Sequence, residues 1–313
     1  MKLIIQIPCK NEQDHLPQVI KELPTKIDGI DSIEYQVIDD WSSDQTSAVA
    51  KKLWVHHILR FTQNKGLWFA FKEWVENALK NWADIVVNTD ADNQYPSKYI
   101  ADLIKPILAW TADIVIWDRN PTHVKHFWPL KRFLQGLGNI VVSYAAGIKL
   151  KDSVSGFRAY NRNALLELNV TSRFSYVVDT IVQAAKKWLK IERVPITINL
   201  PTRKSRLFKN IFQHIKKTTA NLIRVYIMYE PFKILLRISV PFLLVGMFGI
   251  LRFIYYYFLW DGVGKIQSLV ISGIVMQIGM TLLILGIIAD LIAKNRFLIE
   301  ENLKMMKKMK YGK

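Results

Sequence analysis

The segment Asp90 to Gln94, DADNQ, holds two carboxylates one residue apart, directly after the apolar run Ile85 to Val87. If that run is a buried strand, its carboxyl end fixes both carboxylates, and the Gln94 amide adds a neutral oxygen. Mg²⁺ and Mn²⁺ prefer oxygen ligands, often one or two carboxylates together with substrate phosphates. A solvated acidic loop has the same pattern. The segment alone therefore predicts either a divalent-metal site or an ordinary loop.

Two other polar segments follow apolar runs in the same way. Asp39 and Asp40 come after Tyr35–Ile38, and a carboxylate there can accept hydrogen bonds from a ribose or a base. The segment Pro8 to Glu12 leaves the first apolar run and can offer backbone N–H groups to a nucleotide. Ser43 or Asp44 has a structural alternative, because either could cap a helix that begins near residue 46.

Short apolar runs and amphipathic stretches alternate over the first 200 residues, which predicts an α/β fold. The predicted strands are Leu3–Ile7, Tyr35–Ile38, His56–Phe61, Ile85–Asn88 and Asp113–Ile116, and the predicted helices are Leu16–Leu23, Thr46–Leu53, Trp68–Asn81 and Tyr99–Ala109. Buried strands without polar alternation indicate a mostly parallel sheet covered by helices on both faces. Ligands of such sheets bind beyond the carboxyl ends of the strands, where the three polar segments fall.

The C-terminal third predicts membrane attachment. Residues 207–232 form a basic amphipathic stretch, typical of a helix in a membrane interface or of a surface helix packed on the domain. Two apolar segments, 238–259 and 268–293, are each long enough to cross a bilayer core of about 30 Å, and the short loop between them predicts a hairpin. Two buried helices of a soluble core are the alternative. The tail 296–313 is rich in lysine, and such flanks stay cytoplasmic.

Composition narrows the class of partner. The formal net charge of +17 indicates an anionic partner such as a phosphorylated substrate, a membrane surface or nucleic acid. Much of that charge lies beside the apolar segments, so no nucleic-acid partner is expected. The single cysteine, Cys9, excludes a disulfide framework and a multi-cysteine zinc site. The first residues do not resemble a secretory signal, and the N-terminal domain is expected on the cytoplasmic face of the cell membrane.

Six motifs together resemble the family-2 glycosyltransferases. They are IPCKNE, VIDDWSSD, NKGLWFA, NTDADNQYP, SVSGFRAY and RKSRLFKNIF, in this order between residue 4 and about residue 212. Within that family the chain resembles the polyprenyl-phosphate sugar synthases, the group of dolichyl-phosphate mannose synthase. The resemblance implies a GT-A fold and inverting transfer of a sugar from a nucleotide-diphosphate sugar to a polyprenyl phosphate. The implied domains are a transferase domain over 1–206, an interfacial region over 207–232, two membrane helices within 233–295 and a cytoplasmic tail over 296–313.

The resemblance also implies roles for individual residues. Those implied at the nucleotide-sugar are Pro8, Asn11, Glu12, Ile38, Asp40, Asp90 and Ala91. Those implied at the metal, Mg²⁺ or Mn²⁺, are Asp90, Asp92 and Gln94. Those implied in catalysis and at the two phosphate groups are Asp92, Arg119, Arg132, Ser155, Arg158, Arg203 and Arg206. Lys10 departs from the aromatic residue often found there, which puts a base-stacking contact in doubt.

This chemistry is physically consistent. A phosphate acceptor is anionic at neutral pH, so the site needs no strong general base. It must neutralise charge instead, with a metal at the leaving diphosphate and arginines at the incoming phosphate. Arginine suits phosphate because its planar fork makes bidentate hydrogen bonds.

The tryptophans are unusual in number and place. The chain has 10 Trp and only 14 Gly, against about 22 Gly expected at roughly 7%. Trp54, Trp82, Trp110 and Trp188 each follow a predicted helix, at the position where a left-handed backbone favours glycine. Trp41 lies in a predicted tight turn. One hypothesis is that all ten stand where the natural protein has glycine, because the source reads UGA as glycine. The alternative is genuine tryptophans in a membrane protein with an aromatic belt, as Trp260 would suit.

Other functions stay open from the sequence. A membrane glycosyltransferase with another lipid or a polysaccharide as acceptor is the nearest alternative. In the family, the positions of Trp41, Trp68 and Trp117 are commonly glycine. If these tryptophans are genuine, they crowd the donor site and favour an inactive nucleotide-sugar-binding scaffold. The oligomeric state, the sugar and the nucleotide are not indicated.

Overall fold

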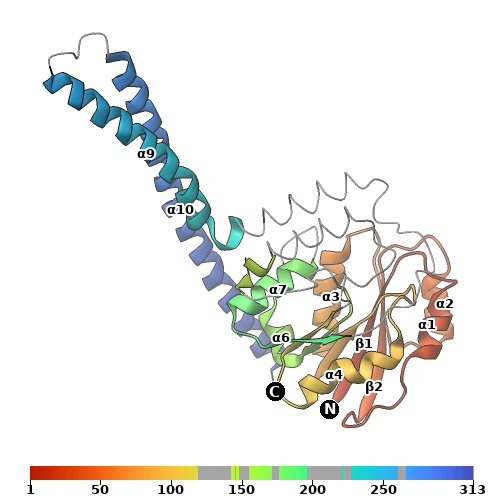
Figure 1. The fold of residues 1–313 in the computed structure, drawn as a ribbon. Coiled ribbons are helices and arrows are strands. Elements are labelled where there is room, and N and C mark those ends of the chain that lie inside the picture. Colours follow the sequence, from red (N-terminus) through yellow and green to blue (C-terminus); the bar gives the residue numbers. More distant parts are fainter. Residues whose placement is uncertain are drawn as a thin grey trace. The chain divides into compact units, whose positions relative to one another are not determined.

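The structure is a computed structural model that describes residues 1–118, 142–144, 146–147, 155–170, 176–195, 220, 224, 227–259 and 266–312. The chain divides into two compact units. Unit 1 comprises Met1–Leu222 together with Leu303–Lys313, and unit 2 comprises Ile223–Asn302. Figure 1 shows unit 1 as a sheet with helices packed on it and unit 2 as long paired helices.

Within the described part of unit 1, seven strands form one sheet in the order β3-β2-β1-β4-β6-β5-β7. They are β1 (Lys2–Cys9), β2 (Ser32–Asp39), β3 (His57–Arg60), β4 (Ile85–Asn88), β5 (Ile114–Asp118), β6 (Arg158–Asn161) and β7 (Ile191–Pro195). All pairs are parallel except those of β6, which runs antiparallel to β4 and β5. The predicted α/β class with a mostly parallel sheet is confirmed. β6 and β7 were not predicted.

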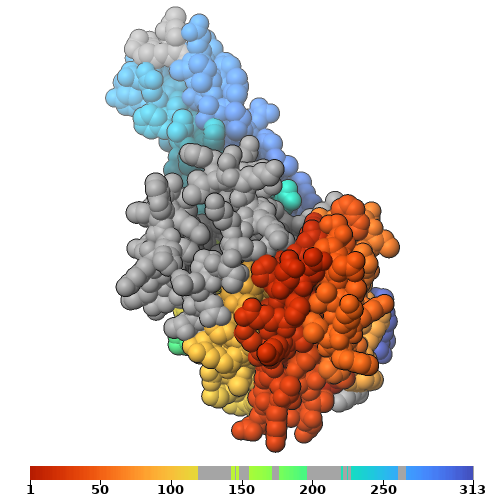
Figure 2. Space-filling model, turned by 90° about the vertical axis from the view of Figure 1, so that its right-hand side faces the viewer, coloured from red at the N-terminus to blue at the C-terminus, as the bar shows by residue number. Residues whose placement is uncertain are grey.

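Helices cover both faces of this sheet (Figure 1). They are α1 (Leu16–Glu22), α2 (Thr46–Lys52), α3 (Leu67–Lys80), the 3-10 turn η1 (Ser97–Tyr99), α4 (Ile100–Leu108), α6 (Arg162–Glu167) and α7 (Tyr176–Lys186). Alternate side chains of β1 point to opposite faces, as the strand period requires. Leu3 and Ile5 belong to the hydrophobic core with α1 and α4. Gln6 lies on the other face and accepts a hydrogen bond from Gln36, which also donates to the Trp74 carbonyl of α3. In Figure 2 the red, orange and yellow segments of unit 1 form one continuous face.

Four helices of unit 1 end in the same hydrogen-bonded motif, with tryptophan at its left-handed position. After α2, the Trp54 N–H donates to Lys51 O and the Val55 N–H donates to Ala50 O. The same pair of bonds follows α3, α4 and α7, at Trp82, Trp110 and Trp188. The φ angles of the four tryptophans are 54°, 59°, 59° and 58°. This is the Schellman motif, whose left-handed residue is usually glycine. Trp41 also has a positive φ, of 62°, so the predicted left-handed backbone is confirmed at all five positions.

Unit 2 contains α9 (Pro231–Phe258) and α10 (Ile266–Tyr311), although the last residues of α10 belong to unit 1. Both helices are long enough, and each contains a stretch apolar enough, to cross a membrane. They approach closely where glycine leaves room: a Cβ on Gly246 would lie 2.7 Å from the Met276 Cβ. α9 and α10 thus pack as two helices joined by residues 259–265.

The observed helices extend beyond the predicted spans. α9 begins at Pro231 rather than at 238, and α10 continues to Tyr311, through most of the stretch predicted as a tail. Lysine, glutamate and methionine favour a helix over 296–311, and Arg296 pairs with Glu300 one turn on, at 3.0 Å. The predicted interfacial region 207–232 lies mainly outside the described residues.

The end of α10 packs on the rest of unit 1. Lys304 forms an ion pair with Glu167 at the end of α6. The Lys307 amine donates to the Leu168 carbonyl at 2.7 Å, and Arg162 donates to the Tyr311 carbonyl. Burial, partly offset by nearby Glu76, lowers the pKa of Lys307 to about 8.

Candidate functional site

Three loops meet at the carboxyl edge of the parallel strands. Cys9 at the end of β1 pairs with Asp39 at the end of β2, while Gln6 of β1 pairs with Asn88 at the end of β4. The Asp40 N–H donates to the Cys9 carbonyl at 2.9 Å, so the first two loops leave the sheet together. The three polar segments singled out in the sequence therefore start from adjacent strand ends, as predicted.

The loop after β1 is tied to the loop after β2. The Asn11 N–H donates to Ser42 Oγ at 2.9 Å, and the Asn11 side-chain oxygen accepts the Ser43 N–H at 2.8 Å. The Glu12 N–H donates to Thr46 Oγ1 at 2.9 Å, and the Glu12 side chain is buried beside His15. These contacts place Asn11 and Glu12 at the edge of the site and give Asn11 a structural task in addition to its predicted one.

The neighbouring carboxylates Asp39 and Asp40 have different surroundings. Asp39 is fully buried, accepts the Ser42 N–H at 2.7 Å and also binds the Ser47 hydroxyl. Asp40 is only half-buried, and its two oxygens accept the backbone N–H groups of Lys65 and Gly66 at 2.9 and 3.2 Å. Asp39 therefore shapes the turn, whereas Asp40 faces the opening of the loop and also positions the start of α3.

Asp44 has a structural role, but not the predicted one, because the N-cap residue of α2 is Gln45 and no side chain caps this helix. Its carboxylate accepts the Thr46 N–H at 3.0 Å and the Gln13 N–H at 3.2 Å. Burial raises the pKa of this carboxyl, but hydrogen bonds from Thr46 and Gln13 outweigh it and hold the pKa below its ordinary value. Asp44 therefore stays ionised and joins the first two loops.

The Asp90 carboxylate lies beside the start of β6. A Cβ on Gly156 would be 3.7 Å from Asp90 Oδ1 and 3.6 Å from the Tyr176 hydroxyl. Asn88 holds this corner by donating to the Gly156 carbonyl at 2.9 Å and to the Tyr176 hydroxyl at 3.2 Å. Asp90 is thus placed by strand β4 on one side and by the segment before β6 on the other.

Asp92 and Gln94 follow in a turn anchored by its neighbours. Asp92 Oδ1 accepts the Gln94 N–H at 3.2 Å, and the Asn93 amide donates to the Glu22 carboxylate at 3.1 Å. Ala91 between the carboxylates is buried in the core. Asp90, Asp92 and Gln94 are all half-buried. Within the described ranges, no group of three or more His, Cys, Asp or Glu side chains forms a metal site.

The electrostatics of this edge are strongly negative. Burial, and then the charges of Glu12, Asp39, Asp44 and Asp90, raises the pKa of the Cys9 thiol well above its ordinary value. Four carboxylates within reach of one buried thiol would repel a diphosphate unless a cation lay between them. The donor set of Asp90, Asp92 and Gln94 is made of oxygen, as Mg²⁺ and Mn²⁺ prefer. The residues present therefore fit a divalent cation together with a phosphorylated ligand.

An aromatic cluster stands beside the Asp90–Gln94 turn. Tyr95 stacks on Phe157 with ring centroids 5.2 Å apart, and Trp117 meets Tyr95 edge-on at 4.7 Å. Phe157 and Trp117 are fully buried. Trp117 therefore fills the space next to the turn that carries the two carboxylates.

The predicted phosphate contacts are described only in part. Arg119, Arg132, Arg203 and Arg206 lie outside the described residues. Arg158 is fully buried, and its guanidinium donates to the carbonyls of Ser155 and Val177 and to the Thr180 hydroxyl, at 2.7 to 2.8 Å. That environment braces the start of β6 and is closed to solvent. Ser155 is also fully buried, and its hydroxyl has no hydrogen-bond partner within the described part of the chain.

Pro8 and Ile38 occupy the strand ends themselves. Ile38 is fully buried on β2 and Pro8 is half-buried on β1, where the two residues are cross-strand partners. Their backbones lie at the edge where the loops diverge, so only the Pro8 side chain has a surface to offer.

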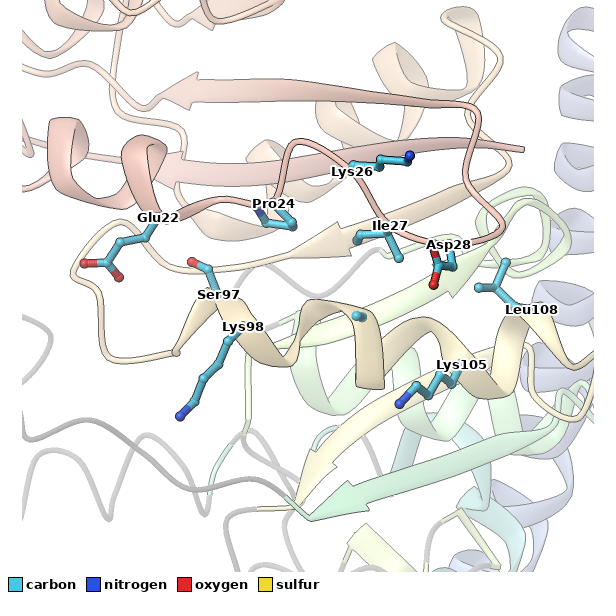
Figure 3. Close-up of a pocket in the computed structure, with 10 residues that line it drawn as sticks. Glu22, Pro24, Lys26, Ile27, Asp28, Ser97, Lys98, Lys105 and Leu108 are labelled. Carbon is cyan, nitrogen blue, oxygen red and sulfur yellow. The ribbon is translucent and has the colours of Figure 1, made fainter.

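A separate hollow of about 700 Å³ lies between the loop after α1 and the residues of η1 and α4. Figure 3 shows Lys26 and Asp28 on the loop after α1, with Lys98 and Lys105 on η1 and α4 across from them. None of the residues predicted for the site lines this hollow. It touches the site only through Glu22, the partner of Asn93.

Sequence reasoning missed the residues that place Asp90. Asn88, Gly156 and Tyr176 lie far apart in the chain and carry no charge or motif spacing that would join them. Gly156 lies inside the motif SVSGFRAY, which was the one available signal. Tyr176 had none, since it begins a helix that was not predicted.

The fold and the site together define a nucleotide-sugar transferase of the GT-A class. The sequence model of Glycosyl transferase family 2 matches residues 4–168. The chain therefore belongs to family 2 of the glycosyltransferases and is a glycosyltransferase.

Named relatives agree with this placement. The chain is 31% identical over 227 residues to a dolichol-phosphate mannosyltransferase of Pyrococcus furiosus, an alignment that covers 69% of this chain and 62% of that one. It is 27% identical over 207 residues to an undecaprenyl-phosphate mannosyltransferase of Micrococcus luteus, covering 63% and 83%. Among solved structures, glucosyl-3-phosphoglycerate synthase of Mycobacterium tuberculosis, in complex with Mn²⁺, UDP and phosphoglyceric acid, superposes with a TM-score of 0.56 at 17% identity, covering 72% and 77%. This likeness confirms the predicted fold class.

Proposed function

We propose that this enzyme transfers a sugar from a nucleotide-diphosphate sugar to the phosphate of a polyprenol, at the cytoplasmic face of the cell membrane. One observation carries the proposal: Asp90 and Asp92 extend from the end of β4 at the edge where the Asn11–Glu12 and Asp40 loops leave β1 and β2. Two relatives named above act on dolichol phosphate and undecaprenyl phosphate. Helices α9 and α10 are apolar enough to keep the chain at a membrane, where such a lipid acceptor resides.

The nucleoside is proposed to bind over the first two loops. Asp40 presents a half-buried carboxylate that can accept hydrogen bonds from hydroxyl groups, while Lys65 and Gly66 fix its orientation. Glu12 lies behind it, and Pro8 forms the floor. Because these loops are tied together through Asn11 and Ser43, the nucleoside meets a surface that is already ordered.

The diphosphate is proposed to lie over the Asp90–Gln94 turn. Asp90, Asp92 and Gln94 would hold Mg²⁺ or Mn²⁺; a synthase of similar fold was crystallised with Mn²⁺ and UDP. When bound, the cation would offset the charge of the diphosphate as it leaves. Asn88 and Tyr176 keep Asp90 in place for this task.

The acceptor phosphate needs no base from the protein. Its second ionisation has a pKa of about 6, as in other phosphate monoesters. One phosphate oxygen attacks the anomeric carbon, the bond from that carbon to the donor phosphate oxygen breaks, and the nucleoside diphosphate leaves with the electron pair. Attack from the opposite side inverts the anomeric configuration. Arg119, Arg132, Arg203 and Arg206 are proposed to position the two phosphate groups. Arg158 is excluded from this set because it is buried.

The test is transfer of label into lipid. Membranes carrying the full chain are incubated with Mg²⁺ or Mn²⁺, polyprenyl phosphate and a panel of labelled nucleotide-sugars, and the lipid extract is counted. Label in the extract that requires both the polyprenyl phosphate and the cation supports the proposal. Label that enters another lipid or a polysaccharide would show a different acceptor. No transfer with any donor, while nucleotide-sugar still binds, would favour the scaffold.

A further inference from the structure

Five tryptophans occupy backbone conformations in which tryptophan is a poor choice. Among the described residues, seven non-glycine residues have a positive φ, and five of them are Trp41, Trp54, Trp82, Trp110 and Trp188. The other two are Asn11 and Asn93. Asparagine is the non-glycine residue that tolerates this region, whereas a bulky side chain there is a rare outlier. Apart from glycine, only tryptophan and asparagine take a positive φ in the described ranges, and tryptophan is the more frequent of the two.

Local hydrogen bonding fixes the conformation at four of these sites. The paired bonds at Trp54, Trp82, Trp110 and Trp188 are the same after α2, α3, α4 and α7. Each of these helices then returns to the sheet within a few residues, so the sharp turn is required by the topology. A residue without a Cβ meets that requirement best.

The side chains of these tryptophans bury little surface that could offset the backbone strain. Trp54, Trp110 and Trp188 are 88%, 75% and 92% exposed. Trp82 is half-exposed, with the Arg162 guanidinium 5.3 Å from its ring. A tryptophan normally stabilises a fold by burying its large aromatic ring. Here the rings point into solvent at strained positions, so neither backbone nor packing explains them.

We infer that residues 41, 54, 82, 110 and 188 are glycine in the functional protein, and that tryptophan stands there because UGA codons which the source decodes as glycine were read as tryptophan. A single decoding rule accounts for all five positions, and it also accounts for the shortage of glycine beside the excess of tryptophan. The same rule extends to Trp68, Trp117 and any other tryptophan whose codon is UGA.

Glycine at these positions would also change the donor site, a step that rests on the proposed function. Trp41 directly follows Asp40 and is 55% exposed, so its ring stands at the loop over which the nucleoside is proposed to bind. Trp117 fills the space against Tyr95, beside the Asp90–Gln94 turn. Glycine at both positions opens the surface at the two ends of the proposed nucleotide-diphosphate site.

The codons and the native peptide give the direct test. The inference requires UGA at all five positions in the gene, and glycine at each of them in peptides of the protein isolated from its source and read by tandem mass spectrometry. A UGG codon or a tryptophan residue at these positions overturns it.

The folding test compares three full-length variant sets with the printed sequence, each changing all five positions. The sets are Trp→Gly, Trp→Asn and Trp→Ala. Relief of left-handed strain predicts that the glycine set melts highest, asparagine next and alanine lowest, with glycine about 10 °C above the printed sequence. An alanine set as stable as the glycine set, or a glycine set less stable than the printed sequence, contradicts the inference. Should a variant set not express, the codons and peptides decide alone.

The site test is separate from catalysis. Nucleoside diphosphates are titrated with Mn²⁺ into the five-position glycine protein with and without Trp117→Gly and Trp68→Gly. Tighter binding is expected when these are added. A higher melting temperature without any nucleotide binding would support glycine at the five positions and reject the proposed function. Nucleotide binding without a higher melting temperature would reject glycine at the five positions and leave the proposed function standing.

Discussion

Two adjacent carboxylates, Asp39 and Asp40, illustrate what a residue type can and cannot indicate. Both follow the same strand, and the sequence marked both as functional. The structure separates them because Asp39 is fully buried and binds Ser42 and Ser47 within the turn, while Asp40 is half-buried and binds the start of α3. Side-chain direction at a strand end depends on the following turn, which the sequence shows only indirectly.

Removal of the Asp40 carboxylate should weaken donor binding more than it weakens the fold. Asp40→Ala leaves the N–H groups of Lys65 and Gly66 without their acceptor at a half-exposed position, so the loss of unfolding free energy should stay near 1–2 kcal/mol. The KM for the nucleotide-sugar should rise about tenfold. Asp39→Ala is the matched control, and it should lower stability more because that carboxylate is fully buried. Equal effects of the two changes on stability, with no change in KM, would place Asp40 outside the donor site.

Loss of Asp92 should affect transfer with little effect on folding. Asp92 is half-buried and accepts the Gln94 N–H within its own turn, so it does not belong to the hydrophobic core. We expect Asp92→Ala to lower the transfer rate by at least about 100-fold, since disruption of even an outer-shell metal contact costs 10- to 100-fold. Asp102→Ala removes a surface carboxylate paired with Lys105 and should leave transfer unchanged. Unchanged transfer in Asp92→Ala would make the metal assignment wrong.

Arg158 shows why a motif cannot distinguish a binding arginine from a bracing one. Arg158→Met should leave the carbonyls of Ser155 and Val177 unsatisfied in a buried setting, at a cost of about 3 kcal/mol or more. The melting temperature should fall, and the KM for polyprenyl phosphate in the protein that stays folded should be unchanged. A stable variant with a raised acceptor KM would restore the phosphate role that the family resemblance implied.

Apolar runs located whole elements better than they located element ends. The strands β1, β4 and β5 were found because nearly all of their residues are buried, so each reads as a mostly apolar run. β2 and β3 were found from shorter apolar runs, although β3 is only half-buried. β6 was missed because its four residues, Arg158 to Asn161, include an arginine whose burial depends on α7. β7 was missed because its five residues, IERVP, include two charged side chains and a proline and therefore do not form an apolar run. Both depend on contacts with distant segments, and local pattern does not contain that information.

The left-handed helix ends, in contrast, could be located from local sequence. Tryptophan stands there at positions where a left-handed backbone favours glycine. Each non-glycine residue in that conformation costs roughly 1–2 kcal/mol. The five tryptophans together would therefore cost roughly 5–10 kcal/mol, which is comparable with the whole net stability of a typical domain, about 5–15 kcal/mol. A chain with that composition would fold poorly, and this is why the codons matter for any expression of the protein.

Docking of the α10 end on unit 1 should strengthen with pH. The pKa of Lys307 is lowered by burial from 10.5 to about 8, so between these values the undocked amine holds a proton that the docked amine has lost. Stability therefore rises from pH 8 to pH 10.5 and is flat below pH 8. The gain should approach about 3 kcal/mol, at about 1.4 kcal/mol per pH unit. The charges facing this amine are Glu76, Lys187, Lys72 and Glu167.

Hydrogen exchange of residues 303–312, measured from pH 7 to pH 10 and corrected for intrinsic rates, tests this. Lys307→Met, which removes the titrating group, should show protection that depends less on pH than in the unchanged chain. The Lys310→Met variant is the control because that amine is exposed. Identical pH dependence in the Lys307→Met and unchanged proteins would show that the docked amine keeps its ordinary pKa.

At the scale of the whole molecule, charge and hydropathy predicted the orientation that the proposed reaction requires. Positive charge is found on the transferase unit, which precedes the two apolar segments, and on the end of α10, which follows them. If both segments cross the bilayer, these two flanks lie on the same membrane face. Lysine-rich flanks are retained in the cytoplasm, where nucleotide-sugars are made available to an enzyme of this kind. Two helices of sufficient length are weak support alone, but two apolar helices that expose most of their side chains would be insoluble as a free surface.

The orientation can be read with thiol labelling, because the one natural cysteine, Cys9, is buried and gives little background. Gly264→Cys lies in the sequence between the two spans, and Met309→Cys is at an 80% exposed position near the end of α10. In intact cells an impermeant maleimide should label Gly264→Cys, whereas Met309→Cys should react only after the membrane is permeabilised. The reverse pattern would place the transferase unit outside, away from any cytoplasmic nucleotide-sugar. Labelling of both positions in intact cells would mean that α9 and α10 do not span the bilayer as a pair. The proposal that the site faces the cytoplasm would then lose its support from membrane topology.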